Sequence, residues 1–229
     1  MLHNAINIIN DKKDRLDVAN IFLLAREKVL ASIAFKEVFT YLYIRKELLG
    51  SESWKEQYNL ALKMYDATTK ATFGAGKYAE MKKSINIVLN NTTSILHLVN
   101  IYNLKIKFYN NERKFENAID TARRILDKIG ESIFNLFPEI ELERAKNLIV
   151  GKSNEVIPSM KKMTNDVSNV AIRTLNEIVT SSYIAKPELI FFIATKIVQL
   201  TFQNGVSKYS TFSFCTLRAL LCKNQDQID

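Results

Sequence analysis

The scarcity of turn-forming residues is the feature that most limits how this chain can fold. Only six glycines and three prolines occur in 229 residues, whereas sheets and long loops need both residue types at their turns. Apolar residues also recur every three or four positions along nearly the whole chain, which is the spacing of a buried helix face. With 47% hydrophobic residues the chain can bury a sizeable core. We therefore predict an all-α fold.

The periodic segments predict six helices up to residue 130 and four more after it. The first six cover 19–30, 35–49, 54–73, 78–89, 98–109 and 115–129, and the later four cover 139–148, 163–183, 188–203 and 209–222. Gly130 is expected to end the sixth helix, because glycine is the usual residue just past a helix end. Pro187 is expected at the first position of the ninth helix, where its missing N–H costs nothing.

A short pattern recurs at the start of three of these helices. Each copy follows a helix and places an aromatic residue, Phe35, Tyr78 or Phe115, three positions before a small or medium apolar one. The aromatics are 43 and 37 residues apart, near the period of about 34 of tetratricopeptide (TPR) repeats. Residues three apart share a helix face, so the aromatic covers the first helix of a hairpin where the smaller residue allows a close crossing.

The repeat leads to a division of the chain into two parts. We expect residues 1–130 to form a TPR-like array of helical hairpins, an α-solenoid. Residues 131–229 are expected to form an irregular C-terminal helical subdomain packed on that array, because Phe137-Pro138 and Ile157-Pro158 interrupt the periodicity there.

Arrays of this type present a concave groove lined by the first helix of each hairpin. The polar candidates for a partner-binding groove are Asn59, Lys63, Asn103 and Lys107, and the candidate aromatic anchors are Tyr65 and Tyr102. The alternative for both aromatics is that they belong to the core.

The sequence contains no pattern that indicates catalysis or a cofactor. Gly74-Ala75-Gly76-Lys77 lacks the length and the preceding strand of a phosphate-binding loop, and the repeat explains it as a hairpin turn. The two histidines, His3 and His97, have no companions for a triad or a metal site. The run Glu139-Glu141-Glu143 is expected to be solvated surface. We predict no enzyme activity, no cofactor and no metal in this segment.

Charge and cysteine content constrain the partners. The net charge of +8 suggests nucleic acid, but the cations are mostly dispersed lysines, so we expect protein partners instead. Cys215 and Cys222 lie seven apart, too far for a disulfide within a helix, and are expected to be reduced core residues. The most apolar stretch, Leu189 to Leu200, is too short to span a bilayer. No signal-peptide layout precedes it, so a cytoplasmic location is expected.

Over nearly its whole length the sequence resembles a known region of very large bacterial signalling proteins. That region is the TPR-like helical segment that follows the AAA/STAND-type ATPase module in proteins with serine/threonine-kinase-like and sensor histidine kinase domains. The matching positions are His3-Asn4-Ala5, Asp14-Arg15-Leu16, Ala19, Lys28, Ala31-Ser32, Ala34-Phe35, Trp54, Tyr58, Leu60-Ala61-Leu62, Gly76-Lys77-Tyr78, Phe115-Glu116-Asn117-Ala118, Ser182-Tyr183, Ala185, Pro187-Glu188-Leu189, Lys196, Val198, Leu200, Gly205 and Ser207.

These are packing positions, so the resemblance implies an architecture and a context but no active site. It implies a regulatory segment that transmits or restrains signals between an ATPase and output domains, and that binds an inducer or holds the ATPase closed. The chain would then be a fragment, a split reading frame or a truncated homologue. The alternatives are a stand-alone TPR-like peptide-binding adaptor and a basic helical nucleic-acid-binding protein.

Overall fold

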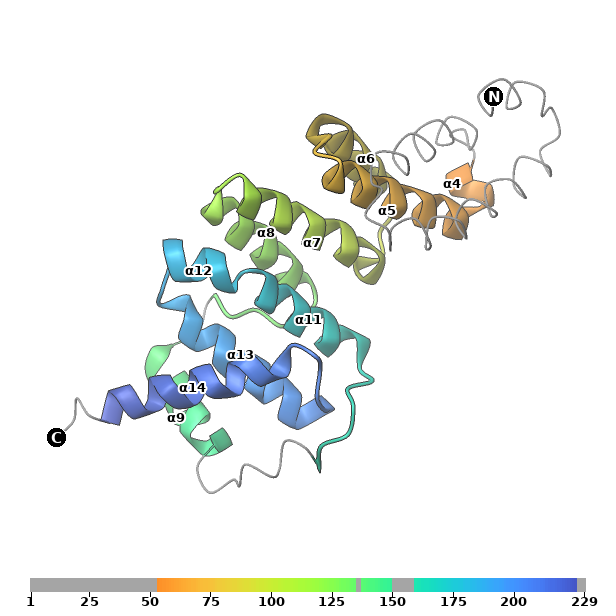
Figure 1. Ribbon diagram of the computed structural model, residues 1–229. Helices are drawn as coiled ribbons and strands as arrows, with labels where there is room; N and C mark the ends of the chain where they lie inside the picture. The colour runs from red at the N-terminus through yellow and green to blue at the C-terminus, as the bar shows by residue number, and fades with distance from the viewer. Residues whose placement is uncertain (1–52, 135–136, 150–158, 226–229) are drawn as a thin grey trace, which may run out of the picture. The chain divides into compact units, whose positions relative to one another are not determined.

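The computed structural model describes residues 53–134, 137–149 and 159–225. These residues form helices and one isolated parallel bridge, between Lys162 and Val206, which confirms the predicted all-α helical array (Figure 1). The chain folds as two compact units, Met1–Thr93 and Ser94–Asp229. The predicted division after residue 130 falls inside the second unit. The helices expected at 19–30 and 35–49, and the turn at Phe35, lie outside the described residues.

The first unit contains a helical hairpin preceded by one helical turn. The elements are α4 (Ser53–Glu56), α5 (Tyr58–Gly74) and α6 (Tyr78–Asn91). The sequence predicted one helix from Trp54 to Phe73, but the backbone breaks at Gln57, where φ is −143°. The break turns the Trp54 ring onto α5, where it lies 5.2 Å from the ring of Tyr65 between centroids.

The second unit begins with a hairpin that repeats the first one. It consists of α7 (Ile95–Asn111) and α8 (Phe115–Lys128), which have 17 and 14 residues like α5 and α6. The helices start at residue 58 and again at 95, and at 78 and again at 115, 37 positions later in each case. The second and third copies of the sequence pattern therefore begin equivalent helices.

The two hairpins also turn in the same way. Gly76 (φ +69°) and Arg113 (φ +56°) occupy the left-handed position just past the first helix. The next amide bonds back across the helix end in both copies, from Lys77 N to Thr72 O and from Lys114 N to Tyr109 O, each 2.8 Å. This is the Schellman motif, and it confirms that the glycine-rich segment at residue 74 is a hairpin turn.

The remaining helices of the second unit form two further layers. The layer next to α7 and α8 contains α11 (Asp166–Glu177), α12 (Val179–Ala185) and α13 (Leu189–Asn204). The outer layer contains α9 (Pro138–Ile149) and α14 (Ser210–Gln225), both packed on α13 (Figure 1). In chain order, helix α9 comes after α8 of the first layer and before α11 of the second layer, although it packs in the outer layer.

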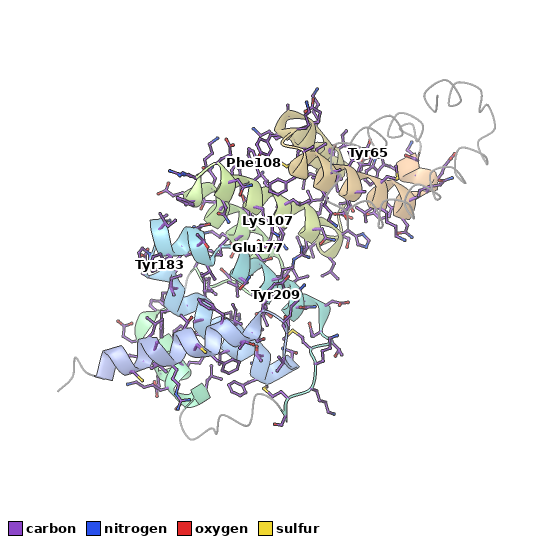
Figure 2. All side chains as sticks on the ribbon, viewed as in Figure 1. Tyr65, Lys107, Phe108, Glu177, Tyr183 and Tyr209 are labelled. Atoms are coloured by element: carbon purple, nitrogen blue, oxygen red, sulfur yellow. The ribbon has the colours of Figure 1, made fainter. Side chains whose placement is uncertain are left out.

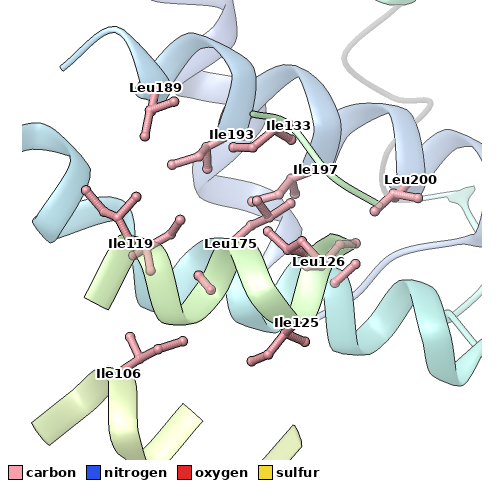
Figure 3. Close-up of a cluster of buried hydrophobic side chains, with 14 of the residues drawn as sticks. Ile106, Ile119, Ile125, Leu126, Ile133, Leu175, Leu189, Ile193, Ile197 and Leu200 are labelled. Carbon is pink, nitrogen blue, oxygen red and sulfur yellow. The ribbon is translucent and has the colours of Figure 1, made fainter. Parts of the chain in front are cut away.

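The central core of the second unit lies between α8, α11 and α13. Ile119, Ile125 and Leu126 of α8 meet Leu175 of α11 and Ile193 and Ile197 of α13 (Figure 3). Ala118 is fully buried three residues after Phe115, and Met81 of the first unit is fully buried three residues after Tyr78. In the two copies that the structure describes, the small or medium partner of the repeat aromatic is therefore a close-packing position, as predicted.

Two predicted helix boundaries in the second unit were wrong. The helix expected over 163–183 begins at Asp166, where Asn165 caps it through Ser168 N (3.0 Å), and it breaks at Ile178 into α11 and α12. Asparagine is a preferred N-cap, so this start was readable in the sequence. Pro187 lies in the turn before α13 instead of at its first residue.

Gly205 ends α13 and joins it to the segment before α11. Its φ is +101°, and an added Cβ would lie 2.4 Å from the Lys161 carbonyl oxygen. Two neighbouring backbone hydrogen bonds, from Met163 N to Val206 O (3.0 Å) and from Val206 N to Lys161 O (2.8 Å), hold these two chain segments together. Only glycine permits this approach, so Gly205, just past the end of α13, also fixes the entry to α11.

Candidate partner-binding surface

In the first unit, the structure separates the groove candidates on α5 into exposed and buried residues. Asn59 and Lys63, one turn apart, are exposed. Tyr65 is 8% exposed and stacks against Trp54 (Figure 2). Burial raises the pKa of the Tyr65 phenol, while a hydrogen bond with Trp54 partly opposes the rise. Tyr65 is therefore a core residue, the alternative interpretation of the sequence.

In the second unit, the candidates on α7 face other helices of the same chain. Tyr102 is half-buried against the central core. Asn103 is 1% exposed, and its Oδ1 accepts a hydrogen bond from Thr174 Oγ1 (3.3 Å). Lys107 Nζ lies 3.2 Å from Glu177 Oε1, and the two side chains are labelled in Figure 2. None of the three lines an open groove.

These contacts belong to a longer polar stripe, which we call the α7 seam: Asn100, Asn103, Lys107 and Asn110. Arg173 Nη1 donates to Asn100 Oδ1 (2.9 Å), and Asn110 Nδ2 donates to the Glu177 carbonyl (3.0 Å). Ser181 Oγ also donates to Asn110 Oδ1. Helices α11 and α12 therefore occupy the face of α7 on which a groove was expected.

The sequence contained half of the signal for the α7 seam. Its residues recur at spacings of three, four and three on one helix face, which marks a polar contact with another element. Their partners lie 67 to 73 residues further along the chain. A single sequence does not show which distant polar residues pair, so the stripe was interpreted as a surface for an external partner.

The described residues do not form a metal-binding group of side chains. No three His, Cys, Asp or Glu side chains among them come together in a way that would hold a metal ion, and His97 is exposed on α7. A shallow pocket of ≈ 570 Å³ lies beside Gly205. Its side-chain walls are Phe202, Met160 and partly or fully exposed polar residues, without a buried titratable group.

Two expectations about polar residues of the outer layer were wrong. Cys215 and Cys222 are free thiols, but they are exposed, because α14 turns Ser213 and Leu217 inward and the cysteines lie on the opposite face. Glu141 is 3% exposed instead of solvated, and its Oε1 pairs with Arg144 Nη1 (2.5 Å). In the parts of the chain that the structure describes, no helix is long and apolar enough to cross a membrane.

Comparison with known proteins links the sequence to signalling. The chain is similar to "Hybrid signal transduction histidine kinase G" of Dictyostelium discoideum, with 22% identity over 246 aligned residues. The alignment covers 91% of this chain but only 7% of that kinase. No family model matches the sequence, and no solved structure matches it.

Proposed function

We propose that this chain is a non-catalytic helical scaffold in signal transduction, which makes protein–protein or interdomain contacts for a cytoplasmic ATPase/kinase assembly. The duplicated hairpin carries the proposal, because hairpins repeated along the chain with one length and one turn geometry are the building blocks of repeat scaffolds. The similarity to a hybrid histidine kinase supports the signalling context. The partner would be a protein or an adjacent domain, without nucleic acid, membrane insertion or metal.

The surface proposed for the contact is the exposed part of α5, at Asn59 and Lys63. Of the six sequence-derived groove candidates, these two are exposed, whereas the Lys107 side chain is 44% exposed but pairs with Glu177. The α7 candidates contribute to the fold instead, through the α7 seam and the central core. A cation and an amide one helical turn apart fit an acidic or amide-rich segment of a partner.

The test compares the partners of two charge-reversal variants of the full-length chain, each expressed in the cells that normally produce the protein. Lys63→Glu alters the proposed surface on α5, and Lys83→Glu makes the same charge change at an exposed site on α6. Partners are quantified by proximity labelling and mass spectrometry. We expect a kinase- or ATPase-domain protein that the wild type and Lys83→Glu label equally and that Lys63→Glu labels about tenfold less, a loss of about 1.4 kcal/mol.

Two results would contradict the proposal. Equal loss of the partner in both variants would remove α5 as the contact, and enrichment of no signalling protein would remove the context. The non-catalytic part is tested on the purified chain with ATP. Hydrolysis or phosphoryl transfer that persists through repurification and disappears on unfolding would refute it.

A further inference from the structure

Helix α9 packs on the rest of the second unit through a small apolar cluster in the outer layer. Among the α9 side chains that the structure describes, the fully buried apolar residue is Ala145, and Leu148 is half-buried. Both pack in a small outer cluster with Ala194 and Val198 of α13 and Leu217 of α14. None of the described α9 side chains belongs to the central core. The apolar surface that fastens α9 is therefore a small part of what fastens the unit.

Polar contacts do not tie α9 to its neighbours either. Among the described residues, its one side-chain hydrogen bond, from Arg144 to Glu141, is internal to the helix. Helix α11 makes a useful contrast, since Ile172 and Leu175 are fully buried in the central core and the α7 seam adds hydrogen bonds on another face. A helix of 12 residues is marginal in water without packing.

The side of α9 that faces away from the cluster is also apolar in part. Ile140 of α9 is 56% exposed, and Phe137, the residue just before the helix, is 68% exposed. Removal of α9 would uncover Ala194, Val198 and Leu217, which are 0–2% exposed. Helices α13 and α14 would keep their direct contact and present an apolar strip on which a small residue such as Ala145 permits close helix crossing.

We propose that α9 is a releasable helix, and that the strip it covers on α13 and α14 binds amphipathic helices of the same pattern. The occupant is a helix with a small residue at the crossing and a leucine three positions later, the arrangement of Ala145 and Leu148. The proposal does not depend on a role in signalling, because it rests on how α9 is seated.

The release is tested by amide hydrogen exchange on the full-length chain. We expect amides of α9 to exchange at least about 100-fold faster than those of α13, because local opening exposes α9 alone. Leu148→Ala should accelerate exchange in α9 by about tenfold more and leave α13 unchanged. Ile140→Ala is the matched control on the same helix, and its outward side chain predicts no acceleration. Equal exchange in α9 and α13, or acceleration of both by Leu148→Ala, would overturn the release.

The binding strip is tested by adding a fluorescent peptide of residues 137–149 to the full-length protein. The peptide should bind the Leu148→Ala chain more tightly than the wild type, because α9 competes less well in the variant. An Ala145→Asp peptide should not bind, since its charge would be buried in the cluster. Failure of the unmodified peptide to bind a chain whose α9 exchanges fast would overturn the binding strip and leave the proposed signalling function untouched.

Discussion

The two equivalent hairpin turns allow a paired test of the repeat in opposite directions. Gly76 and Arg113 both have positive φ, +69° and +56°, at the same position of a Schellman motif. We expect Gly76→Ala to destabilise the chain and Arg113→Gly to stabilise it. A left-handed conformation costs an L-residue about 1–2 kcal/mol, and this cost is introduced in one variant and removed in the other.

The size of each effect follows from the space around the turn. A Cβ added at Gly76 would meet nothing within 4 Å, so the cost there is conformational and not steric. Glycine also gains about 0.4–1 kcal/mol of entropy in the unfolded chain relative to alanine, which offsets part of the effect in both variants. The net change is about 0.5–1 kcal/mol, a loss for Gly76→Ala and a gain for Arg113→Gly.

Urea unfolding measures both changes. Far-UV circular dichroism follows both units, and fluorescence of the single tryptophan, Trp54, follows the first. For a slope near 2 kcal/mol per molar urea, each midpoint should move by about 0.25–0.5 M. The Gly76→Ala shift should appear in the Trp54 signal. Destabilisation by Arg113→Gly, or stabilisation by Gly76→Ala, would refute the equivalence of the turns.

Further changes test other parts of the structure. Gly205→Ala should destabilise the second unit by at least about 3 kcal/mol, or prevent it from folding, because the new Cβ would collide with the Lys161 carbonyl oxygen. Thermal unfolding measures this loss. Leu126→Ala should cost about 2–5 kcal/mol in the central core, and Phe212→Ala, at a 56% exposed site, less than about 0.5 kcal/mol by the same urea assay. Burial and the nearby Arg124 lower the pKa of Lys105 in the folded chain. The unfolded chain therefore binds this proton more tightly, so the free energy of unfolding rises with pH as the folded chain loses the proton, below the ordinary lysine pKa of 10.5. Lys105→Met should remove that rise, measured as urea midpoints between pH 7 and 10.

The parts of the fold that sequence predicted are those governed by local rules. Spacing of apolar residues located the helices of both described hairpins, and the glycine-rich turn at residue 74 was recognised by its residue types. The left-handed conformation of Arg113 in the second turn had no signal of its own, because arginine carries no left-handed preference. The break at Ile178 had no signal, since an isoleucine there is helix-compatible and its backbone is set by the helices around it.

The side-chain environments were less predictable, because they depend on which element covers which face. Cys215 and Cys222 share a face, as their spacing requires, but whether that face is inward is decided by α13, which packs on the other side of α14. Tyr65 shows the same limit. Its position on α5 is compatible with either a binding anchor or a core residue, and the contact with the Trp54 ring, which makes it a core residue, is not apparent from the sequence. A single sequence shows which residues share a helix face but does not show which other element covers that face.

This limit bears directly on where a partner would bind. In a layered helical unit each layer contacts its neighbours, so a helix face that is turned toward the next layer is covered by it. Helix α7 illustrates this, because α11 and α12 lie on Asn103, Lys107 and Asn110. An accessible helix-binding face in the second unit is therefore expected in its outer layer. There the strip on α13 and α14 has an apolar lining, and the described residues through which the covering helix, α9, joins that apolar cluster are Ala145 and Leu148.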